Sequence, residues 1–277
     1  MDRAAGLQAA PDLVLMKNNF FLNKVAIVTG ASSGIGRATA LALAKQGARV
    51  ALAARRGDAL LELARDINNQ KGDAIVVRTD VTQQEQVGQM VREVLDRWGR
   101  VDILISNAGA YIRSPIVDLD PAELQRSFDV NFFGGVYCVK AALPHMLAQK
   151  SGHIVFVTSM AGKIGVVPDV PYVSAKFALT GFCEVLRQEM HGSGISVTNV
   201  LPGRVDTPLI SHLKFSWITA KISPEKVARA ILAGIRKRKP IVILPPQAGL
   251  LYYINVIAPS LSDRLARYFH IEGWENS

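Results

Sequence analysis

Residues 25–37 read Val25-Ala26-Ile27-Val28-Thr29-Gly30-Ala31-Ser32-Ser33-Gly34-Ile35-Gly36-Arg37, an apolar run that leads directly into a glycine-rich turn and then into a helical pattern. The glycines have the spacing Gly-x-x-x-Gly-x-Gly. Glycine permits a tight turn and a close approach of the backbone to a ligand, and the following helix N-terminus attracts anions. The stretch predicts a strand, a turn that cradles a pyrophosphate, and a helix. The alternative is a glycine-rich turn that binds no ligand.

Apolar, β-branched runs recur along the rest of the chain and alternate with helical patterns. The runs are continuous, as in parallel strands that are buried on both faces. Helical patterns span 35–46, 59–70, 83–98 and 173–190, and Ser223-Pro224-Glu225 has the form of another helix start. This alternation predicts one doubly wound, Rossmann-like α/β domain over residues 1–277, with ligands at the carboxyl ends of the strands. The expected strands are 25–29, 49–53, 74–78, 101–106, 153–158, 196–201 and 241–244.

The composition is that of a folded protein and excludes several other classes. Of 277 residues, 49% are hydrophobic and 20% are charged, which supplies a large core and excludes a disordered chain. Cys138 and Cys183 lie in helical patterns without zinc or disulfide spacing. We therefore expect buried thiols in the reducing cytoplasm, and no metal site. The first 20 residues lack a signal-peptide pattern and are expected to form a loose extension.

The net charge of +9 comes partly from the run Arg236-Lys237-Arg238-Lys239, which also fits a solvated helix end. Neither a nucleic-acid-binding motif nor a basic face with interleaved aromatic residues accompanies it, so nucleic acid is not expected as a partner. The charge suits attraction to a phosphorylated cofactor or to an anionic membrane surface.

The end of the second strand indicates which dinucleotide is bound. Many NAD-binding folds place an acidic residue there for the ribose hydroxyls, whereas an arginine can receive the 2′-phosphate of NADP. Here Ala54 supplies no carboxylate, and Arg55 and Arg56 follow directly. The pattern favours NADPH or NADP+ over NADH or NAD+. The alternative is a solvated arginine pair at a helix start.

Two more polar turns close the third and fourth strands at the same edge of the expected sheet. Asp80 and Val81 follow the third strand, where a carboxylate can accept a hydrogen bond from an adenine amine. Asn107-Ala108-Gly109 follows the fourth strand, where small residues let the backbone approach a ribose. Each turn alone is also an ordinary loop.

A tyrosine and a lysine stand one helical turn apart in Tyr172-Val173-Ser174-Ala175-Lys176, and Ser159 closes an apolar run thirteen residues earlier. An ammonium nearby favours phenolate, which predicts that Tyr172 has a pKa below its ordinary value of about 10. Carbonyl reduction builds negative charge on one oxygen, and a pair of positioned donors stabilises it. The spacing alone also occurs by chance in helices.

With these motifs in order, residues 20–240 resemble the short-chain dehydrogenase/reductase family. The resemblance rests on the turn from Thr29 to Gly36, Asp80, Asn107-Ala108-Gly109, Asn131 in Asn131-Phe132-Phe133-Gly134, Ser159, Tyr172-x-x-x-Lys176 and Pro202-Gly203-Arg204-Val205-Asp206-Thr207. It implies a seven-stranded sheet, a nicotinamide cofactor and an Asn-Ser-Tyr-Lys catalytic tetrad.

Carried onto this chain, the resemblance gives each tetrad residue a role. Tyr172 would protonate the carbonyl oxygen, and Ser159 would hydrogen-bond that oxygen. Lys176 would bind the nicotinamide ribose and lower the pKa of Tyr172, and Asn131 would help to hold a water that connects Lys176 to solvent. Structural alternatives are a strand-end cap for Ser159 and a fixed helix kink for Asn131.

The resemblance also implies a contact of Thr207 with the nicotinamide carboxamide, and a substrate lid over residues 208–222. The lid contains Ile210, Leu213, Phe215, Trp217 and Ile218, which suggests an apolar substrate, the alternative being a packed surface helix. The full set of expected cofactor-binding residues is Gly30, Ser32, Ser33, Gly34, Ile35, Gly36, Arg55, Arg56, Asp80, Val81, Asn107, Ala108, Gly109, Tyr172, Lys176, Pro202, Gly203, Val205 and Thr207.

Two features depart from many members of that family. NADP-preferring members often carry a basic residue in the glycine turn, where this chain has Ser33, so the preference rests on Arg55 with Arg37 or Arg56 assisting. The chain also continues past the last strand with an apolar extension over residues 245–277. We expect a hairpin or an amphipathic helix there, which rests on a membrane interface, frames a lipid-sized pocket or covers a subunit interface.

The leading hypothesis is an NADPH-dependent carbonyl reductase that acts on a hydrophobic ketone, of 3-ketoacyl, keto-lipid or steroid-like type. A second hypothesis is an NAD(P)-dependent alcohol dehydrogenase that works in the oxidative direction. A third is a nucleotide-sensing regulator without turnover, which is disfavoured because Tyr172 and Lys176 are both present. A homo-oligomer, dimer or tetramer, is expected.

Overall fold

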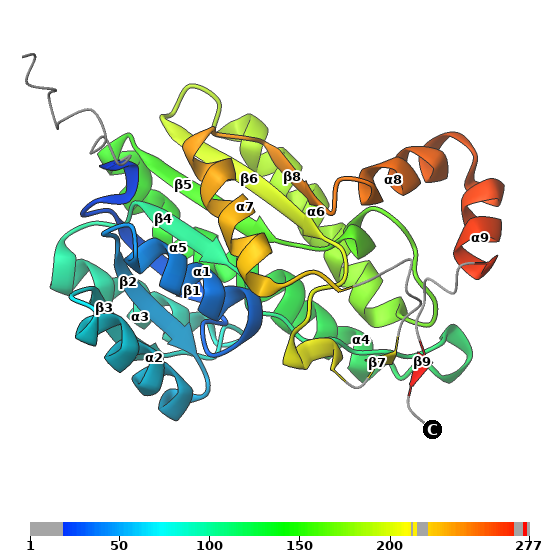
Figure 1. Cartoon of the computed structure of the whole chain (residues 1–277), viewed down its shortest axis with the longest axis horizontal. Coiled ribbons are helices and arrows are strands. Elements are labelled where there is room, and N and C mark those ends of the chain that lie inside the picture. The colour runs from blue at the N-terminus through cyan, green and yellow to red at the C-terminus, as the bar shows by residue number, and fades with distance from the viewer. Residues whose placement is uncertain (1–18, 212, 215–220, 269–273, 276–277) are drawn as a thin grey trace, which may run out of the picture.

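The computed structural model describes residues 19–211, 213–214, 221–268 and 274–275. Seven strands form one parallel sheet in the order β3-β2-β1-β4-β5-β6-β8 (Figure 1). This confirms the predicted fold class. The strands are β1 (Val25–Thr29), β2 (Arg49–Ala54), β3 (Asp73–Arg78), β4 (Ile103–Ser106), β5 (Gly152–Val157), β6 (Ile195–Pro202) and β8 (Ile241–Leu244).

The largest boundary difference is at the start of β4, where the predicted strand began at Val101. Asp102 is not part of the strand, and its carboxylate accepts a hydrogen bond from the backbone N–H of Val25 at 2.9 Å. Arg100 and Lys24 pair with the same carboxylate at 2.6 and 3.3 Å. The Asp102 backbone also bonds to both neighbouring segments, its N–H to the Val25 carbonyl oxygen at 2.9 Å and its carbonyl oxygen to the His153 N–H at 2.8 Å, so the charged cluster adds to these contacts just before the strand begins.

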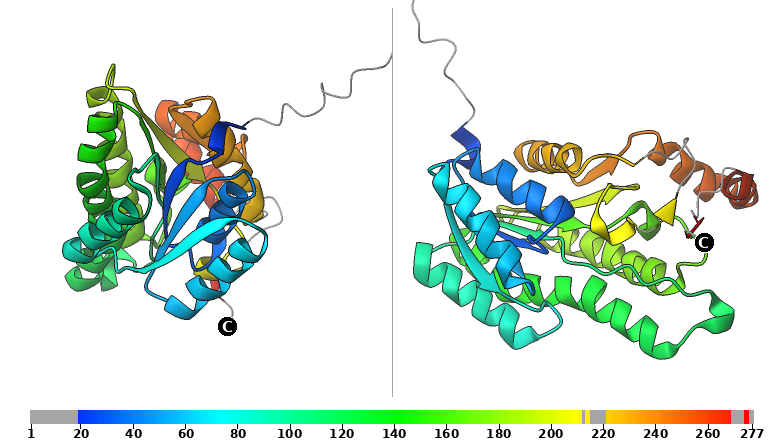
Figure 2. Two further views of the ribbon diagram at one scale, coloured as in Figure 1. Left: turned by 90° about the vertical axis from the view of Figure 1, so that its left-hand side faces the viewer. Right: turned by 60° about the horizontal axis from the view of Figure 1, so that its bottom comes forward.

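Helices cover both faces of the sheet, as the two rotated views show (Figure 2). One face packs against α1 (Gly34–Ala44), α2 (Gly57–Asn69) and α7 (Pro224–Arg236) around residues such as Leu43, Leu63 and Ile231. The other face packs against α3 (Gln84–Trp98), α5 (Gly134–Gln149) and α6 (Val170–Glu189) around residues such as Met90, Met146 and Leu179. Burial on both faces explains why the strand sequences are continuously apolar.

Helix α4 (Pro121–Phe128) precedes α5 and is joined to it by a π-helical segment, Asp129–Phe133. Asp120 caps α4 by accepting a hydrogen bond from the N–H of Ala122 at 2.8 Å. Ser223 caps α7, as predicted, by accepting from the N–H of Lys226 at 3.3 Å. Short 3-10 turns lie at Asn19–Phe21, Ile116–Asp118, Met160–Gly162 and Pro208–Ile210.

In its described part the apolar extension forms two helices, α8 (Ala248–Ile257) and α9 (Pro259–Tyr268), of which α9 has the amphipathic pattern (Figure 1). Farther along, β9 (Trp274–Glu275) pairs in antiparallel fashion with β7 (Leu213–Lys214). Within the part of the chain that the structure describes, no helix is long and apolar enough to span a membrane.

Two sequence-based expectations concern segments that the structure does not describe in full. The loose N-terminal extension falls almost entirely on residues 1–18, outside the described residues. In the expected lid, Ile210 belongs to the turn Pro208–Ile210 and Leu213 is buried in β7. Phe215, Trp217 and Ile218 lie outside the described residues.

Candidate active site

A cleft of about 430 Å³ opens at the carboxyl edge of the sheet and gathers nearly all the residues singled out from the sequence. It is lined by the glycine turn, the polar ends of β2, β3 and β4, and the segment after β6. Three of the four residues expected to form a tetrad, Ser159, Tyr172 and Lys176, also line it. Asn131 lines it as well. Of the expected cofactor-binding residues that the structure describes, Gly36 does not line the cleft.

The glycine turn can be built only with glycine at its key positions. Gly30 and Gly34 have φ angles of +66° and +55°, in the left-handed region that other residues rarely adopt. A Cβ on Gly36 would lie 2.3 Å from the carbonyl oxygen of Gly30 and 2.6 Å from Nδ2 of Asn107. Because Gly36 has no side chain, the first turn of α1 can pack directly against the end of β1.

The turn after β4 is tied to the end of β1 by hydrogen bonds. The side chain of Asn107 donates to the carbonyl oxygen of Thr29 at 2.9 Å. The backbone N–H groups of Asn107 and Ala108 donate to Thr29 Oγ1 at 2.9 and 3.1 Å. These bonds hold the glycine turn and the 107–109 turn as one unit, with the backbone of Gly109 facing the cleft.

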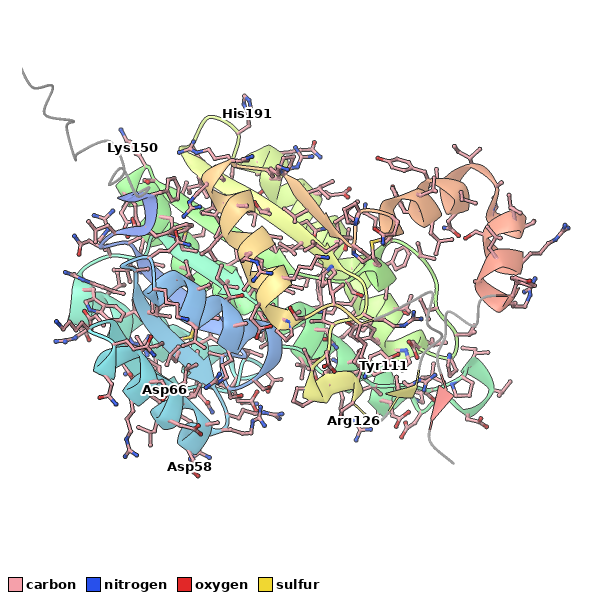
Figure 3. All side chains as sticks on the ribbon, in the orientation of Figure 1. Asp58, Asp66, Tyr111, Arg126, Lys150 and His191 are labelled. Carbon is pink, nitrogen blue, oxygen red and sulfur yellow. The ribbon has the colours of Figure 1, made fainter. Side chains whose placement is uncertain are left out.

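The three arginines considered for a 2′-phosphate lie in different surroundings. Arg56 donates to Ser32 Oγ at 3.0 Å and to Ser33 Oγ at 2.8 Å, so it spans the glycine turn. Arg55 is exposed and lines the cleft. Arg37 instead pairs with Asp66 of α2 at 3.2 Å, and Asp66 is labelled in Figure 3. The structure thus brings Arg55 and Arg56, but not Arg37, to the cleft.

Asp80 is engaged within its own turn. Its Oδ1 accepts hydrogen bonds from the N–H of Thr82 at 3.0 Å and from Thr82 Oγ1 at 2.9 Å. The next residue, Val81, packs closely against Gly134 of α5, where a Cβ would lie 2.8 Å from a Val81 methyl group. The other carboxylate oxygen of Asp80 leaves one acceptor for a ligand in the cleft.

Tyr172 and Lys176 project from the first two turns of α6 and are both buried, with 8% and 4% of their surface exposed. Lys176 Nζ lies 5.6 Å from the centre of the Tyr172 ring and donates to the carbonyl oxygen of Val157 at 3.3 Å. Ser159 begins the turn Met160–Gly162, and its Oγ accepts from the N–H of Ala161 at 3.0 Å. A strand-end cap and a contact with Tyr172 are therefore compatible roles for Ser159.

Burial reverses the expected direction of the Tyr172 pKa. Burial raises this pKa to about 12, while a hydrogen bond with Ser159 lowers it and the charge of Asp169 raises it. The prediction that Lys176 brings the Tyr172 pKa towards neutrality is thus wrong for this structure. Burial also lowers the pKa of Lys176 itself to about 8, so this side chain stays mostly protonated at neutral pH.

Asn131 lies in the π-helical segment and reaches back to the turn after β4. Its Nδ2 donates to the carbonyl oxygen of Ala110 at 2.9 Å, and its Oδ1 accepts from the Ala110 N–H at 3.2 Å. A Cβ on Gly109 would lie 2.9 Å from Asn131 Oδ1 and 3.7 Å from Lys176 Nζ. Asn131 and Lys176 therefore flank the same glycine, whose small size leaves room between them.

The segment after β6 passes close to the glycine turn. Thr207 donates to the carbonyl oxygen of Val205 at 3.3 Å, and a Cβ on Gly34 would meet its methyl group at 2.8 Å. Pro202, Gly203 and Val205 line the cleft beside it. This arrangement brings the expected carboxamide-binding segment next to the expected pyrophosphate turn.

Sequence reasoning did not single out several of the lining residues. Most of them adjoin a motif that it did find, so adjacency along a strand end was the available signal. They are Thr79, Val130, Val157 and Thr158, whereas Pro208, Leu209 and Ile210 belong to the expected lid. Within the described residues, no group of three or more His, Cys, Asp or Glu side chains is placed to hold a metal ion.

Comparison with known proteins agrees with this geometry. The family model for short chain dehydrogenase matches residues 24–215. The chain belongs to the short-chain dehydrogenase family. An uncharacterized oxidoreductase of Bacillus subtilis, YxnA, is 35% identical over 254 residues, which cover 88% of this chain and 71% of that protein. This chain is accordingly an oxidoreductase.

Solved structures of the family share the fold and bind different nucleotides. A short-chain dehydrogenase/reductase from Burkholderia phymatum in complex with NAD superimposes with a TM-score of 0.81 at 24% identity, covering 87% of this chain and 95% of that chain. An alcohol dehydrogenase from Thermococcus sibiricus complexed with 5-hydroxy-NADP has a TM-score of 0.74 at 28% identity, covering 80% and 95%. The fold therefore serves both nucleotides.

Proposed function

We propose that this protein is an NADPH-dependent carbonyl reductase that transfers hydride to a hydrophobic ketone of 3-ketoacyl, keto-lipid or steroid-like type. One observation supports this most: a buried tyrosine hydroxyl, with Ser159 and Lys176 beside it, lies in the same cleft as the glycine turn. The glycines with positive φ and the open backbone at Gly109 form a cradle that fits a dinucleotide.

When bound, the nicotinamide cofactor would supply the hydride. The Tyr172 hydroxyl would donate its proton to the carbonyl oxygen, while Ser159 Oγ would hydrogen-bond the same oxygen. Lys176 would hold the nicotinamide ribose, and Asn131 would keep the space beside Gly109 open to a water that returns a proton. A Tyr172 pKa of about 12 keeps the hydroxyl protonated, and so able to donate, at neutral pH.

The proposal is tested by following NADPH absorbance with straight-chain methyl ketones from butanone to dodecanone, with a 3-ketoacyl thioester and with a keto-steroid. We expect kcat/KM to rise with the apolar length of the ketone, because each buried methylene contributes about 0.8 kcal/mol. Turnover confined to short polar ketones would contradict the hydrophobic substrate class. No turnover with any carbonyl, together with tight NADPH binding, would favour the nucleotide-sensing hypothesis.

Preference for NADPH is the second part of the proposal. Replacing Arg55 by alanine is expected to weaken NADPH binding by about 10-fold or more, since a hydrogen bond to a charged group contributes about 1.5–3 kcal/mol. NADH, which lacks the 2′-phosphate, should bind this variant as it binds the unmodified protein. Quenching of intrinsic fluorescence by each nucleotide measures both dissociation constants.

Arg37→Ala is the matched control, because Arg37 pairs with Asp66 and does not line the cleft. It should leave both dissociation constants unchanged. If Arg55→Ala weakens NADPH and NADH equally, the 2′-phosphate is recognised elsewhere, and Arg56→Ala is the next variant to examine.

The proposal extends to where the protein works: in the cytoplasm, as a homo-oligomer, with α8 and α9 resting on an anionic membrane surface. Helix α8 exposes Leu250, Tyr253, Val256 and Ile257, each at 60% or more. Helix α9 adds the exposed cations Arg264 and Arg267. An apolar helix face bordered by cations is the composition of an interfacial helix pair.

We expect the protein to co-sediment with phosphatidylserine vesicles and much less with phosphatidylcholine vesicles. The double variant Leu250→Ser/Ile257→Ser should lose most of this binding. Val185→Ser, which changes another exposed apolar residue on α6, should not. Sedimentation velocity of the same variants measures the oligomer, and a double variant that dissociates without a change in vesicle binding would assign the helix pair to a subunit interface.

A further inference from the structure

Three polar residues, Tyr111, Arg113 and Asp169, form a partly buried cluster next to the Tyr172 ring. The Tyr111 hydroxyl donates a hydrogen bond to the Asp169 carboxylate. Arg113 Nε pairs with the other oxygen of the same carboxylate at 3.0 Å. The Asp169 and Arg113 side chains are only 3% and 12% exposed. None of the three is among the described residues that line the cleft.

Asp169 occupies the N-cap position of α6, where an aspartate usually caps its helix. Its side chain makes no capping hydrogen bond. Both oxygens face Tyr111 and Arg113 on the segment after β4 instead. Because this buried carboxylate pairs with a distant segment and does not cap its own helix, its role is other than helix initiation.

The cluster is joined to Tyr172 by direct contact. The Tyr111 ring, labelled in Figure 3, stands edge-on to the Tyr172 ring, with ring centres 4.8 Å apart and an interplanar angle of 79°. The two segments are also tied through their backbones, because the Ser114 N–H donates to the Pro168 carbonyl oxygen at 3.0 Å and Ser114 forms a bridge with Asp169. Tyr172 follows Asp169 by three residues on α6.

We propose that Tyr111, Arg113 and Asp169 form a positioning unit that fixes the Tyr172 ring through Tyr111 and places a buried negative charge behind it. The inference rests on the proposed function of Tyr172 as the proton donor. The unit acts through Tyr172, and none of its three residues lines the cleft in the described part of the chain. Its electrostatic consequence can be measured: a negative charge disfavours phenolate and therefore holds the Tyr172 pKa above the value that it would have without Asp169.

The groups around Asp169 determine how strong that effect is. Burial has the largest effect and raises the pKa of Asp169 above its ordinary value, while the Tyr111 hydrogen bond and the charges of Arg113 and Arg204 favour its ionised form. The charge of Asp169 in turn raises the pKa of Tyr172 and of Tyr111. Tyr111 therefore stays protonated and keeps donating to Asp169 while Tyr172 exchanges its proton.

The test is Asp169→Asn. We measure the pH profile of the NADP+-dependent oxidation of 2-dodecanol, the alcohol that corresponds to the dodecanone of the series above. Oxidation requires the phenolate of Tyr172, so its rate rises with pH through the Tyr172 pKa. Loss of the negative charge should stabilise the phenolate and shift this rise to lower pH by about one unit. Glu123→Gln is the control, because it removes a carboxylate from an exposed pair with Arg126 on α4 and should shift nothing.

A spectroscopic titration separates this inference from the proposed function. Tyrosinate absorbance is titrated in each background with and without Tyr172→Phe, and the difference isolates Tyr172. A lower titration midpoint in Asp169→Asn, accompanied by the shifted profile, supports the inference. A lower midpoint with an unshifted pH profile would support the effect of Asp169 on Tyr172 but contradict the proposed role of Tyr172 as the base in oxidation. An unchanged midpoint overturns the inference.

Asp169→Asn breaks the ion pair of two side chains that are 12% and 3% exposed, and the loss of such a pair can prevent folding. Tyr111→Phe is the second variant. It keeps the ring contact with Tyr172 and the ion pair of Arg113 with Asp169, but it removes the hydrogen bond from the Tyr111 hydroxyl to Asp169. We expect its kcat for ketone reduction to fall by about 10-fold at an unchanged KM, because the ring of Tyr172 is then less well fixed. An unchanged kcat in Tyr111→Phe would contradict the positioning role.

Discussion

Replacing Tyr172 by phenylalanine is expected to lower kcat for ketone reduction by about 10²–10⁴-fold, the range contributed by a positioned general acid. In the proposed function the hydroxyl protonates the carbonyl oxygen, and phenylalanine has no proton to give. The ring itself keeps its edge-on contact with Tyr111 and its buried position, so the fold should be retained. Stopped-flow absorbance of NADPH with the best ketone of the series measures the loss.

Binding of NADPH provides the internal check for this variant. Its dissociation constant should change little, because the glycine turn and the 107–109 turn are untouched. Tyr137→Phe makes the same chemical change on α5, where Tyr137 stacks against Phe133 with ring centres 6.2 Å apart, and should leave kcat unchanged. Full reductase activity in Tyr172→Phe would show that the proton comes from another group.

Replacing Gly36 by alanine is expected to weaken binding of either nucleotide by about 100-fold, because a displacement of the order of 1 Å at a binding site has effects of that size. The new methyl group would lie 2.3 Å from the Gly30 carbonyl oxygen and 2.6 Å from Asn107 Nδ2. Neither the backbone of Gly30 nor the hydrogen-bonded Asn107 can move without shifting the pyrophosphate turn. Isothermal titration with NADPH and NADH measures the loss.

Gly181→Ala is the matched control for the glycine prediction. Gly181 lies within α6, and a Cβ there would meet nothing within 4 Å. Alanine in an open helical position should stabilise the fold by about 1 kcal/mol and leave nucleotide binding unchanged. Unweakened binding by Gly36→Ala would contradict the close packing of α1 on the end of β1.

The sequence predicted the sheet well because its strands are buried on both faces and therefore leave long apolar runs. It predicted the glycine turn for a similar reason, since Gly30 and Gly34 adopt φ angles that other residues rarely take. Both signals are local: each is carried by a few consecutive residues. The β4 boundary was missed because Asp102 is paired with Arg100, Lys24 and the backbone of Val25, and such partners cannot be inferred from an apolar pattern.

The features that were not predictable depend on contacts between distant segments. The high pKa of Tyr172 results from burial and from Asp169, neither of which is visible in the Tyr-x-x-x-Lys spacing. Arg56, rather than Arg55, spans Ser32 and Ser33, because the direction of each side chain at the end of β2 is set by the turn that follows. The cluster of Tyr111, Arg113 and Asp169 joins residues more than 50 positions apart.

The strand order divides the cleft between two stretches of the gene. Strands β1, β2 and β3 stand together on one side of the sheet and carry the glycine turn and the arginine pair. Strands β5, β6 and β8 stand on the other side, where Ser159, Tyr172 and the segment after β6 lie. If the proposed function holds, mutations that change the choice of substrate can therefore accumulate in the second half of the coding sequence while the first half stays constant. Descendants of one ancestral gene can in this way diversify their substrates and share a single supply of reducing equivalents.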